Sequence, residues 1–482
     1  MTPASQWPRR NQAVAGLALG SYAAAVALAP DLLTKTLLCA PLIAIPIFWR
    51  LLGTPTAWLA LFFGCALVTP PLPIPLGDSG PHIAIAIAGV GLFIGFLRLA
   101  EWRFHPDALA FSLIALWLIF AGSIAMAAIY SGVAIAAASM ARVLLFGISV
   151  YIFLYVRDGP GRLTFSASVR SIRWLFGAGV LSALYACVDF YFQFAPPAGY
   201  EQQFVWLSSG VYRRAQGFFY EASTLGNLCA FFLEMIAVAL FLRKEDPGEE
   251  PLVSRVALFL GAAPLAAALV LSFSRASLVN LAVALTALIW LQRDRIRWRR
   301  LAGGVAVFGL GGAAILWAAF PVFAQFAWLR VAAAFEYFSE SPNAVLSGRI
   351  DAWETLTNYL IANPWHAILG VGYKTLPYSD FIGAKAVGDN TYLTLLAETG
   401  IAGLFAVIAL NIAILICAYR AARSSSAVRS FTGAWMFCFW AGQSVQMLSA
   451  DLLTYWRVLP VYFFVLALAS VAPRMRIESR PV

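Results

Sequence analysis

The chain has 482 residues, of which 61% are hydrophobic and only 12% are charged, and its mean hydropathy is +0.80. These values lie far outside the range of soluble globular domains. They predict an all-α, polytopic membrane protein and exclude a soluble catalytic domain other than one carried in a loop.

Apolar segments of about 18 to 25 residues, each long enough to cross a hydrocarbon core of about 30 Å as a helix, recur along the chain. They predict a membrane helical bundle of about 12 to 14 spans. In chain order the candidate spans are 12–30, 32–52, 55–73, 82–100, 107–131, 133–156, 172–195, 222–242, 256–272, 275–292, 301–324, 390–418, 431–449 and 455–472.

Basic residues alternate across the short connections between these spans. If the N-terminus is cytoplasmic, 23 of the 33 lysines and arginines fall on the cytoplasmic side, as the positive-inside rule requires. We therefore expect both termini in the cytoplasm. The net charge of +10 is explained by this topology, and we assign it no nucleic-acid partner.

Cysteine and histidine give no sign of a disulfide framework or a metal centre. The six cysteines all fall within apolar spans without paired short spacing, and the three histidines are scattered. No P-loop, dinucleotide fingerprint or haem motif occurs. The sequence therefore predicts neither a metal nor a cofactor.

Ten basic residues lie in the outer half or the outer loops under this topology, against the charge bias. They are Lys35, Arg142, Arg213, Arg214, Arg275, Arg330, Arg349, Lys374, Lys385 and Arg457. Positive charge on that side requires an explanation other than orientation.

Two outer segments are long enough to carry a site. The first is a loop at about 196–221, marked by Pro-Pro and Gly and ending shortly after Arg213 and Arg214. The second, 325–388, is the longest polar stretch, and we expect it to form a periplasmic helical cap. The predicted organisation is thus a transmembrane bundle at 1–324, the cap, and C-terminal transmembrane helices at 389–482.

Within the cap, "GRIDAWETLTNYLIANP" places apolar residues on one face of a helix. The pair Asn363-Pro364 should end that helix. "GVGY", with Gly370 and Gly372, then predicts a tight turn that allows close approach of the backbone. We expect about two helices in this segment.

Arg275 follows the short break Ser272–Ser274 between two apolar runs, so it lies at or near membrane depth. It could snorkel to the headgroups, but a lone Arg after a serine-rich break favours a polar cavity. Arginines on one membrane face suit planar, bidentate binding of phosphate or carboxylate, and so an anionic amphipathic ligand such as a lipid diphosphate. The set is Arg142, Arg213, Arg214, Arg275 and Arg349.

Three landmarks together resemble the O-antigen ligase and O-antigen polymerase family of bacterial envelope membrane proteins. They are "RRAQGFFYEASTLGN", "SFSRAS", and a stretch from "SGRIDAW" through "NPWHAILGVGY" to "DNTYLTLLAETGIAG". In the last stretch, Asn390, Gly400 and Gly403 match the spacing of the ligase pattern His-Asn, nine residues, Gly, two residues, Gly. Asp389 stands where that pattern has His.

The resemblance implies a fold like the GT-C-type glycosyltransferases and a metal-independent, inverting glycosyl transfer. The donor would be a glycan linked to a polyprenol by a diphosphate at the periplasmic face of the bacterial inner membrane. The acceptor would be a second glycan-lipid in a polymerase, or lipid A core in a ligase. Arg213 or Arg214, together with Arg275, would bind the diphosphate; membrane lipids and a chain-length regulator protein are further expected partners.

Asp389 makes a ligase less favoured than a polysaccharide polymerase. We expect Asp389 to orient or deprotonate the acceptor hydroxyl, with capping of the span that begins at Asn390 as the equally weighted structural alternative. Glu221 is a second catalytic candidate. Glu398 could instead pair with an arginine inside the bundle, and His366 fits the surface of the cap better than a base.

A lipid-linked glycan transporter or flippase is the rival from another class, since Asp189, Glu234 and Arg142 are charges within spans. The absence of a clear internal repeat between the halves, and a long outer segment on one side alone, count against it. A bundle with only an assembly role has no motif in its favour.

Overall fold

A computed structural model of the protein describes residues 20–24, 26–29, 31, 34–35, 39, 49, 53–54, 56–72, 80–197, 199–200, 202–207, 210–241, 252–293, 314, 317–318, 325, 328, 332, 343, 348–376 and 389–471. The chain divides into two compact units, 1–58 and 59–482. Most of the predicted span 301–324 and most of the first two spans, with Arg330 and Lys385, lie outside the described residues.

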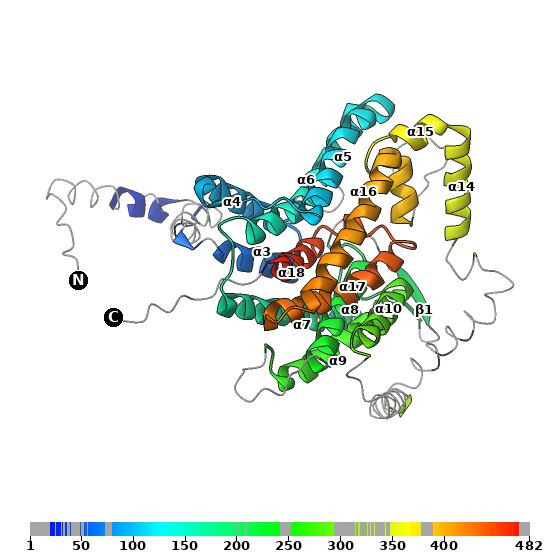
Figure 1. Cartoon of the computed structure of the whole chain (residues 1–482). Coiled ribbons are helices and arrows are strands. Elements are labelled where there is room, and N and C mark those ends of the chain that lie inside the picture. Colours follow the sequence, from blue (N-terminus) through cyan, green and yellow to red (C-terminus); the bar gives the residue numbers. More distant parts are fainter. Residues whose placement is uncertain are drawn as a thin grey trace. The chain divides into compact units, whose positions relative to one another are not determined.

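Helices account for nearly all of the regular structure that the described residues form (Figure 1). In chain order they are α3 (Ala57–Val68), α4 (Ile83–Leu97), α5 (Ala108–Ser131), α6 (Val133–Arg157), α7 (Phe165–Phe192), α8 (Ala222–Phe241), α9 (Arg255–Leu271), α10 (Arg275–Leu291), α14 (Arg349–Ala362), α15 (Pro364–Leu369), α16 (Thr391–Ala422), α17 (Ala427–Gln446) and α18 (Leu459–Ser470), with two short 3₁₀ turns. Each predicted span from 55–73 to 275–292 and from 390–418 to 455–472 corresponds to one of these helices.

In the part of the chain that the structure describes, five helices are long and apolar enough to cross a membrane, namely α5, α6, α7, α8 and α16. The helices α3, α4, α9, α10 and α18 are apolar but shorter. The prediction of an all-α polytopic membrane protein is confirmed. The loop predicted at about 196–221 holds a small antiparallel hairpin, β1 (Phe204–Leu207) and β2 (Gly210–Arg213), in which Phe204 pairs with Arg213.

Helix α18 lies at the centre of the packed bundle. Every residue from Leu459 to Ala469 is buried, and α18 packs against α6, α16 and α17. Aromatic side chains join these helices to α8, where the Phe231 ring lies 4.2 Å from Trp435 and 4.5 Å from Tyr462, centroid to centroid. The helices that carry the site are therefore fixed to one another by their core.

The helix expected in "GRIDAWETLTNYLIANP" is α14, which ends at Ala362, directly before Asn363-Pro364. Pro364 opens the next helix, α15, where its fixed φ is tolerated. The helical content predicted for this part of the cap is thus confirmed, while its division from the bundle stays a prediction.

After α15 the chain enters the bundle through the turn predicted at "GVGY". Gly372 has φ +115°, and a Cβ there would lie 2.5 Å from the backbone of Ala127 in α5. The next residue is fixed on both sides, because Tyr373 N–H donates to Ser123 Oγ at 3.1 Å and Ser139 Oγ donates to the Tyr373 carbonyl at 2.6 Å. Glycine at this turn permits the close backbone approach.

Helix α16 is kinked at Gly400, whose φ is +71°. The kink interrupts the helical hydrogen-bond ladder and releases the carbonyls of Ala397 and Glu398. The N–H groups of Val371 and Gly372 donate to them at 3.0 and 2.8 Å. The predicted glycine motif therefore joins the turn to the kink, and Gly403 lies one turn further along α16.

Candidate functional site

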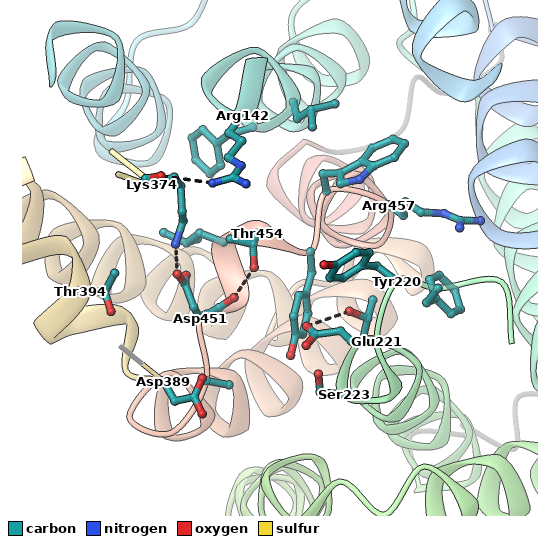
Figure 2. A pocket seen from close by; sticks show the side chains of 18 of the residues that line it. Arg142, Tyr220, Glu221, Ser223, Lys374, Asp389, Thr394, Asp451, Thr454 and Arg457 are labelled. Atoms are coloured by element: carbon teal, nitrogen blue, oxygen red, sulfur yellow. Dashed lines mark hydrogen bonds and ion pairs between the residues drawn. The ribbon is translucent and has the colours of Figure 1, made fainter. Parts of the chain in front are cut away.

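One cavity of about 990 Å³ collects most of the charged residues that the sequence places on the outer side. Its wall is built from α6, the hairpin, the starts of α8 and α10, the Lys374 turn, α16 and the connection between α17 and α18. The charged residues that line it are Arg142, Arg214, Glu221, Arg275, Arg349, Lys374, Asp389, Glu398, Asp451 and Arg457. Figure 2 shows part of this wall.

Arg275 is the first residue of α10 and is exposed at the cavity wall. The predicted break is present, because α9 ends at Leu271 and Phe273 adopts a left-handed φ of +50°. Ser274 then caps α10 by accepting from the Ser277 N–H at 3.3 Å. The break therefore places Arg275 at a helix N-terminus, where the backbone adds a favourable potential for anions.

Arg213 and Arg214 have different roles, although the sequence could not separate them. Arg213 Nη2 donates to Asp189 Oδ1 at 2.7 Å and to the Phe194 carbonyl at 2.8 Å, and this side chain is only 5% exposed. Arg213 does not line the cavity. Arg214 does, and its guanidinium is oriented by Gln203 and by the Ser272 carbonyl.

Arg349, the first residue of α14, pairs with Asp389, with Nε 3.1 Å from Oδ2. Its charge is close enough to Arg275 for the two to repel each other. Asn390, not Asp389, caps α16, because its side-chain oxygen accepts from the N–H groups of Tyr392 and Leu393 at 3.0 and 3.1 Å. The capping interpretation of Asp389 is therefore wrong by one residue.

The Lys374 amine contacts two carboxylates at one corner of the cavity. It forms an ion pair with Asp451 and lies 3.9 Å from Glu398 Oε2. Burial lowers the pKa of Lys374, and the Glu398 carboxylate opposes that change. Arg142 in α6 donates to the Lys374 carbonyl at 3.2 Å. The ion-pair partner of Glu398 is thus a lysine, which corrects the expected arginine.

Glu221 lies at the start of α8, on the other side of the cavity from Lys374 (Figure 2). Thr224 Oγ1 donates to its carboxylate at 3.4 Å. Tyr455 interacts electrostatically with both Glu221 and Asp389, so these two candidate carboxylates approach the same tyrosine. The structure therefore places both of them in the site that the arginines line.

His366 and Arg457, which the sequence analysis also named, each bind neighbouring groups of the fold. His366 lies in α15, where its Nδ1 is 2.6 Å from the Tyr359 hydroxyl and its ring stacks on that tyrosine, as expected of a residue of the cap. Arg457 is buried and donates to the backbone carbonyls of Ala66 and Thr69, each at 2.7 Å, and to that of Phe218. Its guanidinium holds three chain segments together at the edge of the cavity.

Asp451 is the site residue that the sequence reasoning missed. It lies in "SADLLTYWR", between the last two spans, on the side where the basic residues against the charge bias are found. An acidic residue among these outer-side cations is the sequence signal that marks Asp451. Among the described residues, no group of three or more His, Cys, Asp or Glu side chains could hold a metal ion.

Comparison with protein families gives a match over residues 260–408 to the family model described as O-antigen ligase. The matched range contains Arg275, Arg349, Lys374, Asp389 and Glu398 of the cavity. The remaining charged lining residues, on α6, the hairpin, α8 and the connection after α17, lie outside it. No curated protein matches the chain.

Proposed function

We propose that this chain, a member of the O-antigen ligase and polymerase family over residues 260–408, is an inverting polysaccharide polymerase. It would transfer a glycan from a polyprenyl diphosphate to the hydroxyl of a second lipid-linked glycan at the periplasmic face of the inner membrane. The observation that carries the proposal is the convergence of Arg142, Arg214, Arg275 and Arg349, from separate elements, on one cavity that also holds carboxylates.

The arginines supply what a diphosphate leaving group needs. As the glycosidic bond breaks, negative charge grows on the diphosphate, and oriented guanidinium groups stabilise that charge. Arg275 contributes from a helix N-terminus and Arg214 from a guanidinium held by two hydrogen bonds.

The transfer itself requires one bond to form and one to break. The acceptor oxygen attacks the anomeric carbon from the face opposite the leaving group, and the carbon–oxygen bond to the diphosphate breaks with its electron pair. The hydroxyl proton passes to a carboxylate that acts as general base. Asp389 and Glu221 are the carboxylates that the sequence nominates for this step, and both line the cavity.

The polyprenyl chain would lie along the apolar part of the wall. Aliphatic and aromatic side chains from α4, α6 and the hairpin region reach the same cavity, among them Ile85, Leu145 and Phe219. A cavity that joins apolar walls to a cluster of cations suits a ligand with a charged headgroup on a lipid chain. The assignment to the periplasmic side rests on the distribution of basic residues.

Arg275→Ala tests the proposal. We expect glycan transfer by the purified protein to fall about 100-fold to 1,000-fold, because one oriented donor to the developing charge is lost. Arg255→Ala is the matched control, since Arg255 is likewise the first residue of an apolar helix, α9, but does not line the cavity. Normal polymer length in cells that hold normal amounts of Arg275→Ala protein would refute the proposal.

The ligase alternative differs in its acceptor. Deletion of a polymerase leaves single repeat units on lipid A core, whereas deletion of a ligase leaves long polymer on polyprenol. We favour the polymerase because Asp389 occupies the position of the ligase histidine. A chain-length regulator is the protein partner expected for a polymerase.

The transporter alternative is weakened by the partner of Asp189. This buried carboxylate is neutralised by Arg213, which gives it a structural role that needs no transported ion. Glycan elongation by the purified protein in detergent, where there is no membrane to cross, would decide for the enzyme.

A further inference from the structure

Four buried amide side chains form a hydrogen-bonded network just inside the cavity. They are Asn227 of α8, Asn280 of α10, and Gln443 and Gln446 of α17, and none is more than 1% exposed. The Nδ2 groups of Asn227 and Asn280 each donate to the Oε1 atoms of both glutamines, at 2.8 to 3.0 Å. The Tyr462 hydroxyl of α18 donates to Asn227 Oδ1 at 2.6 Å. The network therefore joins four helices of the bundle at one point.

The network lies about one helical turn inside the cavity wall. Thr224 and Asn227 are three residues apart in α8, and Ala276 and Asn280 are four apart in α10; the first of each pair lines the cavity. A turn of α-helix has about 3.6 residues. The four amides thus lie beneath the helix ends that face the cavity, including the end that carries Arg275.

Gln446 also reaches the serine cap of α10. Its Nε2 donates a long hydrogen bond of 3.5 Å to Ser277 Oγ, which lies 2.8 Å from the Oγ of the cap residue Ser274. The two helices approach closely because α17 has glycine at Gly442, where a Cβ would lie 2.3 Å from the Asn280 carbonyl oxygen. Helix α17 is therefore held against the first two turns of α10 (Figure 1).

Stability alone does not account for this network. Among the described residues, Gln443 Nε2 and Asn280 Oδ1 have no hydrogen-bond partner, so the network is incomplete. An incomplete buried network is less stabilising than an apolar core, and hydrogen bonds between membrane helices add little stability. What directional hydrogen bonds add is one defined register between the helices that they join.

We propose that Gln446 is a positioning residue for Arg275, and that it acts by fixing the register of α10 against α17. The inference rests on the proposed glycosyltransferase function, in which the Arg275 guanidinium stabilises the charge that grows on the diphosphate. That stabilisation depends on placement, since a shift of about 1 Å can cost about 100-fold in rate. Gln446 does not line the cavity, so it acts through the helix that carries Arg275 and not on the substrate.

Gln446→Met separates this role from a purely structural one. Methionine keeps the length of the side chain but makes none of its hydrogen bonds, so α17 loses its contact with Ser277 and one of its two with Asn280. Gln443 Oε1 still accepts from both Asn227 and Asn280. No amide donor of α8 or α10 is therefore left without an acceptor, and the unfolding temperature in detergent should fall little.

The test is a double-mutant cycle with Arg275→Ala in the full-length purified protein. Lipid-linked glycan extracted from a strain that lacks this gene is the substrate, and kcat and KM are measured for the four proteins of the cycle. We expect Gln446→Met to lower kcat about 10-fold and to leave KM within about twofold, because placement acts on the developing charge. With Arg275→Ala already present, the same substitution should lower kcat by less than about twofold, because the group that it places is gone.

Asn411→Leu is the matched control. Asn411 is also a buried amide that binds α17, accepting from Trp440 Nε1 at 2.9 Å, but it lies in α16. Its other partners, Tyr392 and Met447, lie in neither α8 nor α10. The fold loss in kcat that Asn411→Leu causes should therefore be the same with and without Arg275.

A kcat within about twofold of wild type for Gln446→Met, or an equal fold loss with and without Arg275, would overturn the inference. If Gln446→Met does not fold, Asn280→Leu removes the α10 side of the same bonds and enters the cycle with the same expected result. Loss of transfer in Arg275→Ala with normal transfer in Gln446→Met would refute the positioning role and retain the transferase. Wild-type protein that transfers no glycan would instead refute the proposed function.

Discussion

Arginines on the same side of the bundle fall into two groups: those whose donors are bound by buried acceptors of the fold, and those that present a guanidinium group to the cavity. Arg213 and Arg457 direct their donors to Asp189 and to backbone carbonyls that are already buried. Arg214, Arg275 and Arg349 present guanidinium groups at the cavity wall. A cation at membrane depth does not by itself mark a binding site, because its nearest buried acceptors determine its role.

The largest expected effect is a loss of stability on substitution of Arg213, one of the arginines whose donors are bound by buried acceptors of the fold. Arg213→Ala leaves Asp189 buried without its partner, which should lower the free energy of unfolding by about 3–5 kcal/mol. Thermal unfolding of the detergent-solubilised protein measures this loss. The double variant Arg213→Met with Asp189→Leu should regain much of the stability, since no unpaired charge remains. A stable, fully active Arg213→Ala protein would contradict the division into two groups.

A smaller effect is expected at Arg214, its neighbour in the chain. Arg214→Ala should leave thermal stability nearly unchanged but raise the KM for the lipid-linked donor about 10-fold, because one charge-assisted hydrogen bond to the diphosphate is lost. Arg214→Lys keeps the charge but loses the planar geometry, so we expect only partial recovery. An unfolding temperature that falls as far as in Arg213→Ala would place Arg214 in the structural group.

The smallest effect is expected at the helix cap beside Asp389. Asn390→Ala removes the acceptor for the N–H groups of Tyr392 and Leu393, which should cost about 1 kcal/mol of stability. Asn390→Asp keeps a capping oxygen and serves as the control. If Asn390→Ala is as stable as wild type while Asp389→Ala is not, the cap has been assigned to the wrong residue.

Local sequence signals predicted the helices that the structure describes, although some ends were wrong: α7 begins at Phe165 and not at residue 172. The apolar runs between 82 and 292 and between 390 and 472 correspond to helices, and Asn363-Pro364 ends α14. The serine break before Arg275 and the glycine turn were also predicted. Each of these depends on residues close together in the chain, where propensity and capping act.

The hairpin, the kink in α16 and the pairing of charged side chains could not be predicted from local sequence signals. The kink at Gly400 is stabilised because the freed carbonyls of Ala397 and Glu398 accept from Val371 and Gly372, residues some 26 positions earlier. Motif spacing identified Gly400 but did not show why a glycine is needed there. A glycine is needed because α16 kinks at this residue, and the kink is stabilised by hydrogen bonds from a distant turn that only the packed bundle brings close.

The sequence by itself determined the fold class and the family resemblance, and it predicts the side on which the charged residues lie, because hydropathy, motif spacing and charge bias are properties of the linear chain. Tertiary structure alone decided which of Arg213 and Arg214 lines the cavity, and it placed Asp451 and Glu398 against one lysine. A side chain's electrostatic role depends on its buried neighbours, and here those neighbours come from helices far apart in the sequence.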